Sequence, residues 1–246
     1  MSLPVHLVES LADVVVGDTV SVTGDEAHHA VAVRRLRVGE RVQLTDGAGS
    51  IAVGAVAATG KRQLEVTVES VAVRPRAVPA VTVVQALPKG ERGELAVEVL
   101  TEVGVDRIVP WAASRSVAVW KGERAVRSLE RWRSTAREAA KQSRRAWFPE
   151  VTDLATLSAA VSVVADADLV LVLHEEAAEP LASVDVTAAG SVAVVVGPEG
   201  GLTVDEVAAF TAAGARAVRL GPEVLRTSTA GLAAVAAVLS RTGRWG

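Results

Sequence analysis

The hydrophobic pattern of the first 73 residues predicts a small β-structure. Short runs of alternating apolar and polar residues indicate strands at residues 41–45, 51–57 and 64–73, and an Asp46-Gly47 turn joins the first two. A short helix is predicted at residues 26–35, with Asp25 as its N-cap. Short strands linked by tight turns are typical of a small β-barrel, which we expect at residues 1–73.

From residue 81 onward, the pattern changes to buried apolar runs separated by helical periodicity. Strands are predicted at residues 81–86, 107–110, 169–173, 191–196 and 215–220, and helices at residues 92–103 and 229–239. Alternating strands and helices predict a mostly parallel sheet. We therefore expect an α/β domain at residues 81–246, joined to the first domain by a linker at residues 74–80 that two prolines stiffen.

Residues 121–145 form an amphipathic helical pattern whose polar face is strongly basic. Three glutamates cannot neutralise the eight Arg and Lys residues of this face through neighbouring pairs. The net charge of the whole chain is −3, yet residues 73–150 carry 15 Lys and Arg against 9 Asp and Glu. A basic centre in an acidic protein favours contact with a polyanion, although a solvated helix face would have the same composition. Trp147 follows this helix and could either stack on a base or pack as a hydrophobic plug.

Two loops rich in glycine and proline follow two of the predicted strands. One covers residues 196–201 and the other residues 220–230. Glycine lets the backbone approach a ligand closely, and proline fixes the backbone angle φ. Because ligands of open α/β sheets bind at the carboxyl ends of the strands, these loops predict one small-molecule pocket. Residues 173–175, at the end of a third strand, would complete it.

The composition excludes several kinds of chemistry. The chain has no cysteine and four histidines, which excludes disulfides and cysteine nucleophiles and disfavours a metal site, so we expect no metal. The apolar runs are too short to span a membrane and no signal peptide is evident, so we expect a cytoplasmic protein with no membrane partner. The common glycine fingerprints of dinucleotide-binding and P-loop proteins are absent.

In their order along the chain, these motifs resemble the bacterial 16S ribosomal RNA uracil-N3 methyltransferases of the SPOUT superfamily. The resemblance rests on these segments: His28-His29 to Arg35, Leu87-Pro88-Lys89-Gly90, Thr101-Glu102, Arg115, Gln142-Ser143 with Arg145, and the two glycine-rich loops. It implies a PUA-like β-barrel for RNA, and a parallel α/β domain with a C-terminal deep trefoil knot. It also implies S-adenosylmethionine as cofactor, a homodimer, and methylation of N3 of the uracil at position 1498 in the 16S rRNA of the small ribosomal subunit.

The pocket loops and the resemblance together predict the residues of the site. The predicted cofactor-binding residues are Leu173, His174, Glu175, Gly197, Pro198, Glu199, Gly200, Gly201, Leu220, Gly221, Leu225, Arg226, Thr227, Ser228 and Thr229. The predicted RNA-binding residues are Arg34, Arg35, Arg37, Lys89, Arg115, Arg131, Arg137, Lys141, Arg144 and Arg145. Arg226 is the candidate catalytic residue, since a permanent cation could stabilise the anion that forms when N3 loses its proton. A structural ion pair that fixes the loop, between Arg226 and Glu199 or a neighbouring residue, is the alternative.

The chain departs from the pattern of the family at several positions. Glu223, Ser228 and Val99 stand where arginine, glutamate and lysine are usual, which leaves the catalytic assignment open. Two other functions also remain open: a related methyltransferase that acts on a ribose 2′-hydroxyl or another base, and a noncatalytic rRNA-binding assembly factor. The lack of cysteine argues against covalent attack on a pyrimidine C6, and so against C5 methylation.

Overall fold

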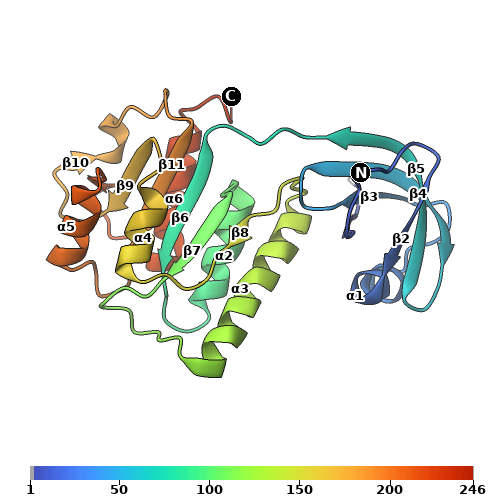
Figure 1. The fold of residues 1–246 in the computed structure, drawn as a ribbon, viewed down its shortest axis with the longest axis horizontal. Helices are drawn as coiled ribbons and strands as arrows, with labels where there is room; N and C mark the ends of the chain where they lie inside the picture. Colours follow the sequence, from blue (N-terminus) through green and yellow to red (C-terminus); the bar gives the residue numbers. More distant parts are fainter. Residues whose placement is uncertain (1–2, 246) are drawn as a thin grey trace. The chain divides into compact units, whose positions relative to one another are not determined.

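The computed structural model describes residues 3–245, which fold as two compact units (Figure 1). Unit 1 contains the chain up to Arg76 together with Ala140–Phe148. Unit 2 contains Ala77–Ala139 and the chain from Pro149 onward. Within the described residues, no helix is long and apolar enough to cross a membrane.

Unit 1 is built on a five-stranded sheet with the order β1-β3-β4-β5-β2. Its strands are β1 (Val5–Leu7), β2 (Thr19–Thr23), β3 (Arg41–Thr45), β4 (Ser50–Thr59) and β5 (Gln63–Val73). Irregularities in the pairing of β4 with β5 increase the local twist and help the sheet to curl. Leu44, Leu64 and Val66 form its core with Ala27 and Ala30 of the adjoining helical segment.

The helical segment of unit 1 differs from the predicted helix at residues 26–35. It consists of α1 (Gly24–His28) and a π-helical turn, η1 (His29–Val33), and it ends before Arg35, whose φ is 57°. Thr23 precedes the first helical residue, so the prediction of Asp25 as N-cap is wrong. The Asp25 carboxylate instead accepts a hydrogen bond from Arg62 at 2.6 Å. The hydrophobic pattern predicted neither β1 nor β2, because β1 is only three residues long and β2 is rich in threonine and serine.

Residues 140–148 pack into unit 1, although the hydrophobic pattern places them with the second domain. Trp147 anchors the segment, because its Nε1–H donates to the carbonyl of Arg74 at 2.8 Å. The guanidinium of Arg76 lies 4.0 Å from the centre of the Trp147 ring. A Cβ atom at Gly49 would lie 2.5 Å from the same ring, so only glycine allows this approach. Trp147 is therefore held by residues of its own unit.

Unit 2 contains a seven-stranded, all-parallel sheet with the order β10-β12-β9-β11-β6-β7-β8. Its strands are β6 (Ala80–Ala86), β7 (Arg107–Trp111), β8 (Glu150–Val151), β9 (Leu169–Leu173), β10 (Glu179–Pro180), β11 (Ser191–Val196) and β12 (Arg216–Arg219). Its helices are α2 (Arg92–Val103), α3 (Gly122–Gln142, whose last three residues belong to unit 1), α4 (Leu157–Val164), α5 (Val204–Ala212) and α6 (Thr227–Leu239). A 3₁₀ turn, η2 (Leu181–Ser183), follows β10. The predicted parallel α/β sheet is thus confirmed.

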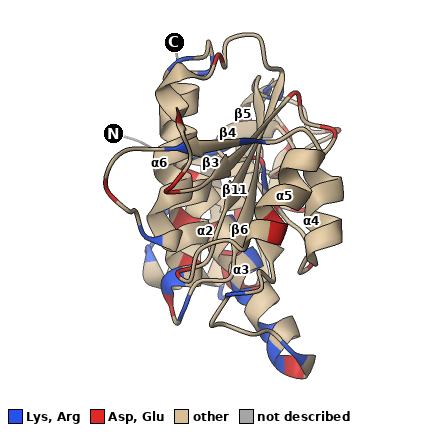
Figure 2. Cartoon of the chain, turned by 90° about the vertical axis from the view of Figure 1, so that its left-hand side faces the viewer, with Lys and Arg blue, Asp and Glu red and all other residues tan. Residues whose placement is uncertain are grey.

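Helices cover both faces of this sheet (Figures 1 and 2). Alternate residues of β11 separate into two cores: Val194 packs with residues of α2, α3 and α6, and Val195 packs with residues of α4 and α5. Burial on both faces explains why the central strands read as continuous apolar runs. The predicted helix at residues 121–145 ends earlier, at Gln142, and Arg144 has φ 57°. The last helix begins two residues earlier than predicted, at Thr227.

Candidate functional site

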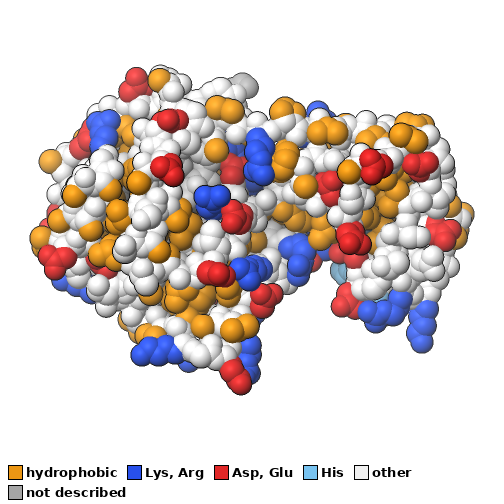
Figure 3. Space-filling view, viewed as in Figure 1, with side chains coloured by type: hydrophobic (Ala, Val, Ile, Leu, Met, Phe, Trp, Pro, Cys, Tyr) orange, Lys and Arg blue, Asp and Glu red, His pale blue; other side chains and the backbone are white. Residues whose placement is uncertain are grey.

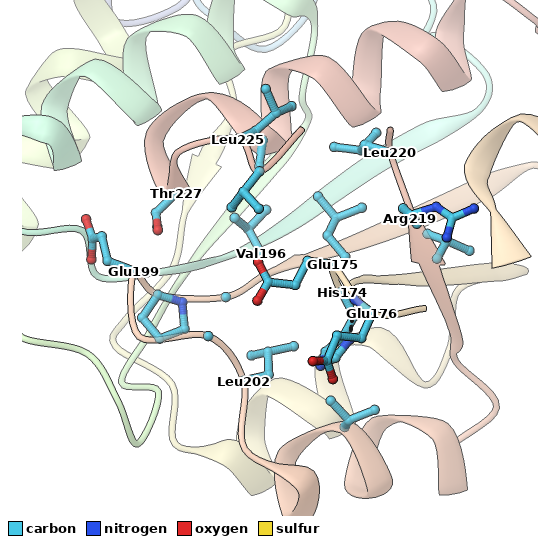
Figure 4. A pocket seen from close by; sticks show the side chains of 18 of the residues that line it. His174, Glu175, Glu176, Val196, Glu199, Leu202, Arg219, Leu220, Leu225 and Thr227 are labelled. Atoms are coloured by element: carbon cyan, nitrogen blue, oxygen red, sulfur yellow. Dashed lines mark hydrogen bonds between the residues drawn. The ribbon is translucent and has the colours of Figure 1, made fainter. Parts of the chain in front are cut away.

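A cavity of about 930 Å³ lies at the carboxyl ends of β9, β11 and β12 (Figure 4). β9 lies between β11 and β12 in the sheet, so the loops that follow these three strands meet at one edge. The loop after β9 supplies residues 173–176, the loop after β11 residues 197–202, and the loop after β12 residues 220–227. The first two turns of α5 and the start of α6 complete the wall.

Most residues predicted to bind a cofactor line this cavity. These are Leu173, His174, Glu175, Gly197, Pro198, Glu199, Gly200, Gly201, Leu220, Gly221, Leu225, Arg226 and Thr227. Ser228 and Thr229 are not among the lining residues: Ser228 is buried in the first turn of α6, and the Thr229 hydroxyl donates to the carbonyl of Arg226 at 3.3 Å. The geometry therefore brings together all three predicted loops, and their roles toward a cofactor remain a prediction.

Sequence reasoning missed the contribution of α5 to the cavity. Val204, Val207, Ala208 and Thr211 of this helix line the wall, and Val204 is 84% exposed. A signal was present, because Thr203 and Glu206 form a capping box, which starts a helix directly after the glycine-rich loop. A helix that begins there must lie beside the loop, so its exposed apolar side chains were candidates for the pocket wall.

His174 is fixed in the cavity by hydrogen bonds on both its backbone and its side chain. Its N–H donates to the carbonyl of Val218 at 3.0 Å, and its Nδ1 accepts from the N–H of Glu176 at 3.2 Å. A neutral imidazole whose Nδ1 accepts carries its proton on Nε2. Neutral His174 therefore offers a hydrogen-bond donor at Nε2 and no proton acceptor there.

The loop after β11 is held by the loops that follow β6 and β7. Glu199 Oε1 accepts from the backbone N–H of Lys89 at 3.1 Å. Arg115 Nη1 donates to the carbonyls of Gly200 at 3.2 Å and Leu202 at 3.4 Å. In the part of the chain that the structure describes, the partner found for Glu199 is thus the Lys89 amide, and no ion pair joins Glu199 to Arg226.

The predicted RNA-binding residues fall into two groups. Arg34, Arg35, Arg37, Lys89, Arg131, Arg137 and Arg144 are exposed. In the space-filling view, basic side chains gather beside α1, and over α3 they are interspersed with acidic ones (Figure 3). The others make contacts within the protein: Lys141 with Glu26, Arg145, whose Nε donates to the carbonyl of Trp147 at 2.9 Å, and Arg115, which is exposed and lines the cavity but donates to the glycine-rich loop.

Lys141 and Glu26 form a shielded ion pair inside unit 1. Lys141 Nζ lies 2.8 Å from Glu26 Oε2, and the two side chains are 11% and 19% exposed. His6, which is 1% exposed, places Nδ1 3.1 Å from Glu26 Oε1. Burial raises the pKa of Glu26, but hydrogen bonds from His6 and Lys141 outweigh it and lower the pKa to about 2. Lys141 is thereby engaged in the structure of unit 1.

No group of three or more His, Asp or Glu side chains within residues 3–245 is arranged to hold a metal ion.

Comparisons with known proteins agree on one family. A family described as "RNA methyltransferase domain" matches residues 75–239, and one described as "RNA methyltransferase PUA domain" matches residues 22–69. The chain is 48% identical over 242 residues to the Ribosomal RNA small subunit methyltransferase E of Mycobacterium bovis, which covers 97% of this chain and 92% of the relative. The protein of the same name from Bacillus subtilis is 33% identical, over 91% of both chains.

A solved structure resembles the whole chain. It is the crystal structure of a Ribosomal RNA small subunit methyltransferase E from Neisseria gonorrhoeae bound to S-adenosyl methionine. The TM-score is 0.86 at 27% identity, and the match covers 97% of this chain and 98% of that one.

Proposed function

Because the chain belongs to the RNA methyltransferase family, we propose that it transfers a methyl group from S-adenosylmethionine to N3 of a uracil in 16S ribosomal RNA. One observation carries the proposal: three loops from adjacent parallel strands enclose a cavity of about 930 Å³ at the sheet edge where α/β proteins bind ligands. The names of the relatives and the cofactor in the Neisseria structure support the same chemistry.

The residues of the cavity fit S-adenosylmethionine. Leu220 and Leu225 offer apolar surface for a flat adenine ring. The carboxylates of Glu175, Glu176 and Glu223 line the same cavity and complement the positive charge of a sulfonium group. Backbone groups of the glycine-rich loops supply hydrogen bonds without side chains in the way. We therefore assign these loops to the cofactor.

When bound, S-adenosylmethionine supplies an electrophilic methyl group, so the protein has to position uracil N3 and promote loss of its proton. Arg226 lines the cavity and is exposed, and its guanidinium stays charged at every working pH. We propose that it stabilises the anion spread over the uracil carbonyl oxygens. Neutral His174, with Nδ1 already accepting, would donate from Nε2 to an oxygen rather than take the N3 proton.

We further propose the organisation that the family resemblance implies. Residues 1–73 would form the RNA-binding PUA-like domain, 74–80 the linker and 81–246 the knotted methyltransferase domain, acting as a homodimer on small-subunit rRNA in the cytoplasm. Half-buried apolar residues of α6, among them Leu232 and Ala236, support the use of this helix in a dimer interface.

A labelling experiment tests the proposed function. The protein is mixed with S-adenosylmethionine carrying a labelled methyl group and with small ribosomal subunits that lack the modification, and the digested RNA is examined by mass spectrometry. We expect labelled 3-methyluridine. A label on a ribose would support the 2′-hydroxyl alternative, and RNA binding without any label would support the noncatalytic alternative. Arg226→Gln should lower kcat at least 100-fold while the Kd for the cofactor changes by about threefold or less.

A further inference from the structure

The loop between β7 and α3 lies directly against the glycine-rich loop after β11. Arg115 makes this contact through one guanidinium nitrogen, Nη1, which donates to the carbonyls of Gly200 and Leu202. The two backbones also touch: a Cβ atom at Gly200 would lie 3.0 Å from Cβ of Arg115 and 3.2 Å from its carbonyl oxygen. Glycine at position 200 therefore serves the approach of Arg115 as well as the cavity.

A buried carboxylate ties the same two loops together at a second point. Glu206 is 2% exposed; its Oε1 accepts from the N–H of Ser114 at 2.7 Å, and its Oε2 accepts from the N–H of Thr203 at 2.8 Å. Burial raises the pKa of Glu206, but the hydrogen bonds from Ser114 and Thr203 outweigh it and hold the pKa below its usual value. The carboxylate is thus ionised at neutral pH and can bind both amides at once.

These contacts hold a segment whose own sequence does not favour a single backbone conformation. Residues 197–201 include three glycines, and φ of Gly201 is 72°. A free loop of this kind samples many conformations, and ordering it on ligand binding costs free energy. Loops that are ordered before the ligand arrives avoid that cost.

We propose that Ser114, Arg115 and Glu206 form a clasp that holds the loop at residues 197–202 in its ligand-binding shape, and that Arg115 is a positioning residue of the cofactor site rather than an RNA contact. The inference rests on the proposed function, because it assigns the ordered loop to S-adenosylmethionine. It reassigns Arg115, which the sequence placed with the RNA-binding arginines. Both hydrogen bonds leave from Nη1, which lies one bond further from Cα than the ammonium nitrogen of a lysine, so a lysine side chain would reach the two carbonyls less well.

The test compares Arg115→Met and Arg115→Lys with Arg131→Met, an exposed arginine on α3. Three quantities are measured for each full-length variant: the Kd for S-adenosylmethionine by calorimetry, the Kd for a 16S rRNA fragment without cofactor at several salt concentrations, and the melting temperature. Arg115→Met should weaken cofactor binding about 10-fold, with RNA affinity and its salt slope unchanged. Arg115→Lys should rescue only part of this loss. Arg131→Met should leave cofactor binding unchanged.

Hydrogen exchange separates the clasp from the identity of the ligand. In cofactor-free protein, Arg115→Met and Glu206→Gln should both speed amide exchange in the peptide that covers residues 197–202. The second substitution leaves one side-chain oxygen in place of two, so the new side chain could accept from only one of the two N–H groups that Glu206 binds.

The clasp would be overturned if Arg115→Met bound the cofactor as tightly as the wild-type protein, or if this substitution reduced the salt slope of RNA binding by about one. Either result would return Arg115 to the RNA surface. If the wild-type protein binds no S-adenosylmethionine, the proposed function fails, and unchanged exchange in both variants would then also refute the clasp.

Discussion

Glu26 is predicted to stabilise unit 1 through its hydrogen bonds to two partners. It receives hydrogen bonds from two cationic or ionisable partners, His6 and Lys141, both nearly buried. Its pKa falls from 4.5 to about 2 in the folded protein. A group with a lowered folded pKa stabilises the fold above its unfolded pKa, and this stabilisation is lost as the pH falls through the folded value. The shift corresponds to about 3 kcal/mol at pH 7.

Glu26→Ala should therefore lower the free energy of unfolding of unit 1 by about 3 kcal/mol at pH 7, within the usual cost of removing one partner from a buried ion pair. At pH 3 the expected difference falls to roughly 1.5 kcal/mol, because the wild-type carboxylate is then losing its advantage over the unfolded chain. Amide exchange read from peptides of β4 and β5 reports on unit 1, and peptides of β11 report on unit 2.

The control is Glu69→Ala, which removes an equally close but exposed pair with Arg41 at 2.9 Å. Side chains 57% and 42% exposed make this pair worth less than about 1 kcal/mol. A Glu26→Ala effect that stays constant between pH 3 and pH 7 would refute the electrostatic reasoning. An effect no larger than that of Glu69→Ala would show that burial of the pair contributes nothing.

Three further substitutions test packing and charge. Gly49→Ala should destabilise unit 1 by about 2 to 4 kcal/mol, because the new Cβ meets the Trp147 ring. The control is Gly17→Ala, where φ is 97° but the new Cβ has open space among the described residues, so the expected cost is only about 1 to 2 kcal/mol. Equal urea midpoints for the two variants would contradict this prediction. Gly231→Val should lower the melting temperature, since its Cβ would lie 3.0 Å from Leu100 and 3.3 Å from Val196; an unchanged melting temperature would mean that α6 shifts freely. Arg137→Gln should reduce the salt slope of RNA binding by about one without changing cofactor affinity, and an unchanged slope would assign this side chain to a solvated face.

The central strands of unit 2 were predictable because each is buried on both faces. β9 and β11 were predicted with their observed bounds, since a run such as Ser191–Val196 has no polar side to obscure it. The carboxyl ends of these strands then located the cavity, because parallel strands present their following loops at one edge. Burial and chain direction were enough for this part of the site.

Elements that depend on distant partners were not predictable in the same way. β8 and β10 have two residues each and exist only through pairing with β7 and β12. The helix α4 is made of alanine, valine, leucine and serine only. Its sequence therefore shows little helical periodicity and is hard to distinguish from that of a strand of similar length. The packing of Trp147 on Gly49, about one hundred positions apart in the chain, leaves no local mark in the sequence.

Charge is the property for which composition and structure differ most. The excess of Lys and Arg in residues 73–150 predicts a polyanion surface only if those side chains face solvent. Several of them do not act there as free charges: for example, Arg115 binds two carbonyls, Lys141 is paired with a buried carboxylate, and Arg133 bonds to Glu130, Asp153 and the carbonyl of Val151. Each such contact lowers the number of cationic side chains that are available to bind RNA phosphates. The number of counterions released on RNA binding should therefore follow the exposed arginines, such as Arg137, and fall short of the number that the sequence contains.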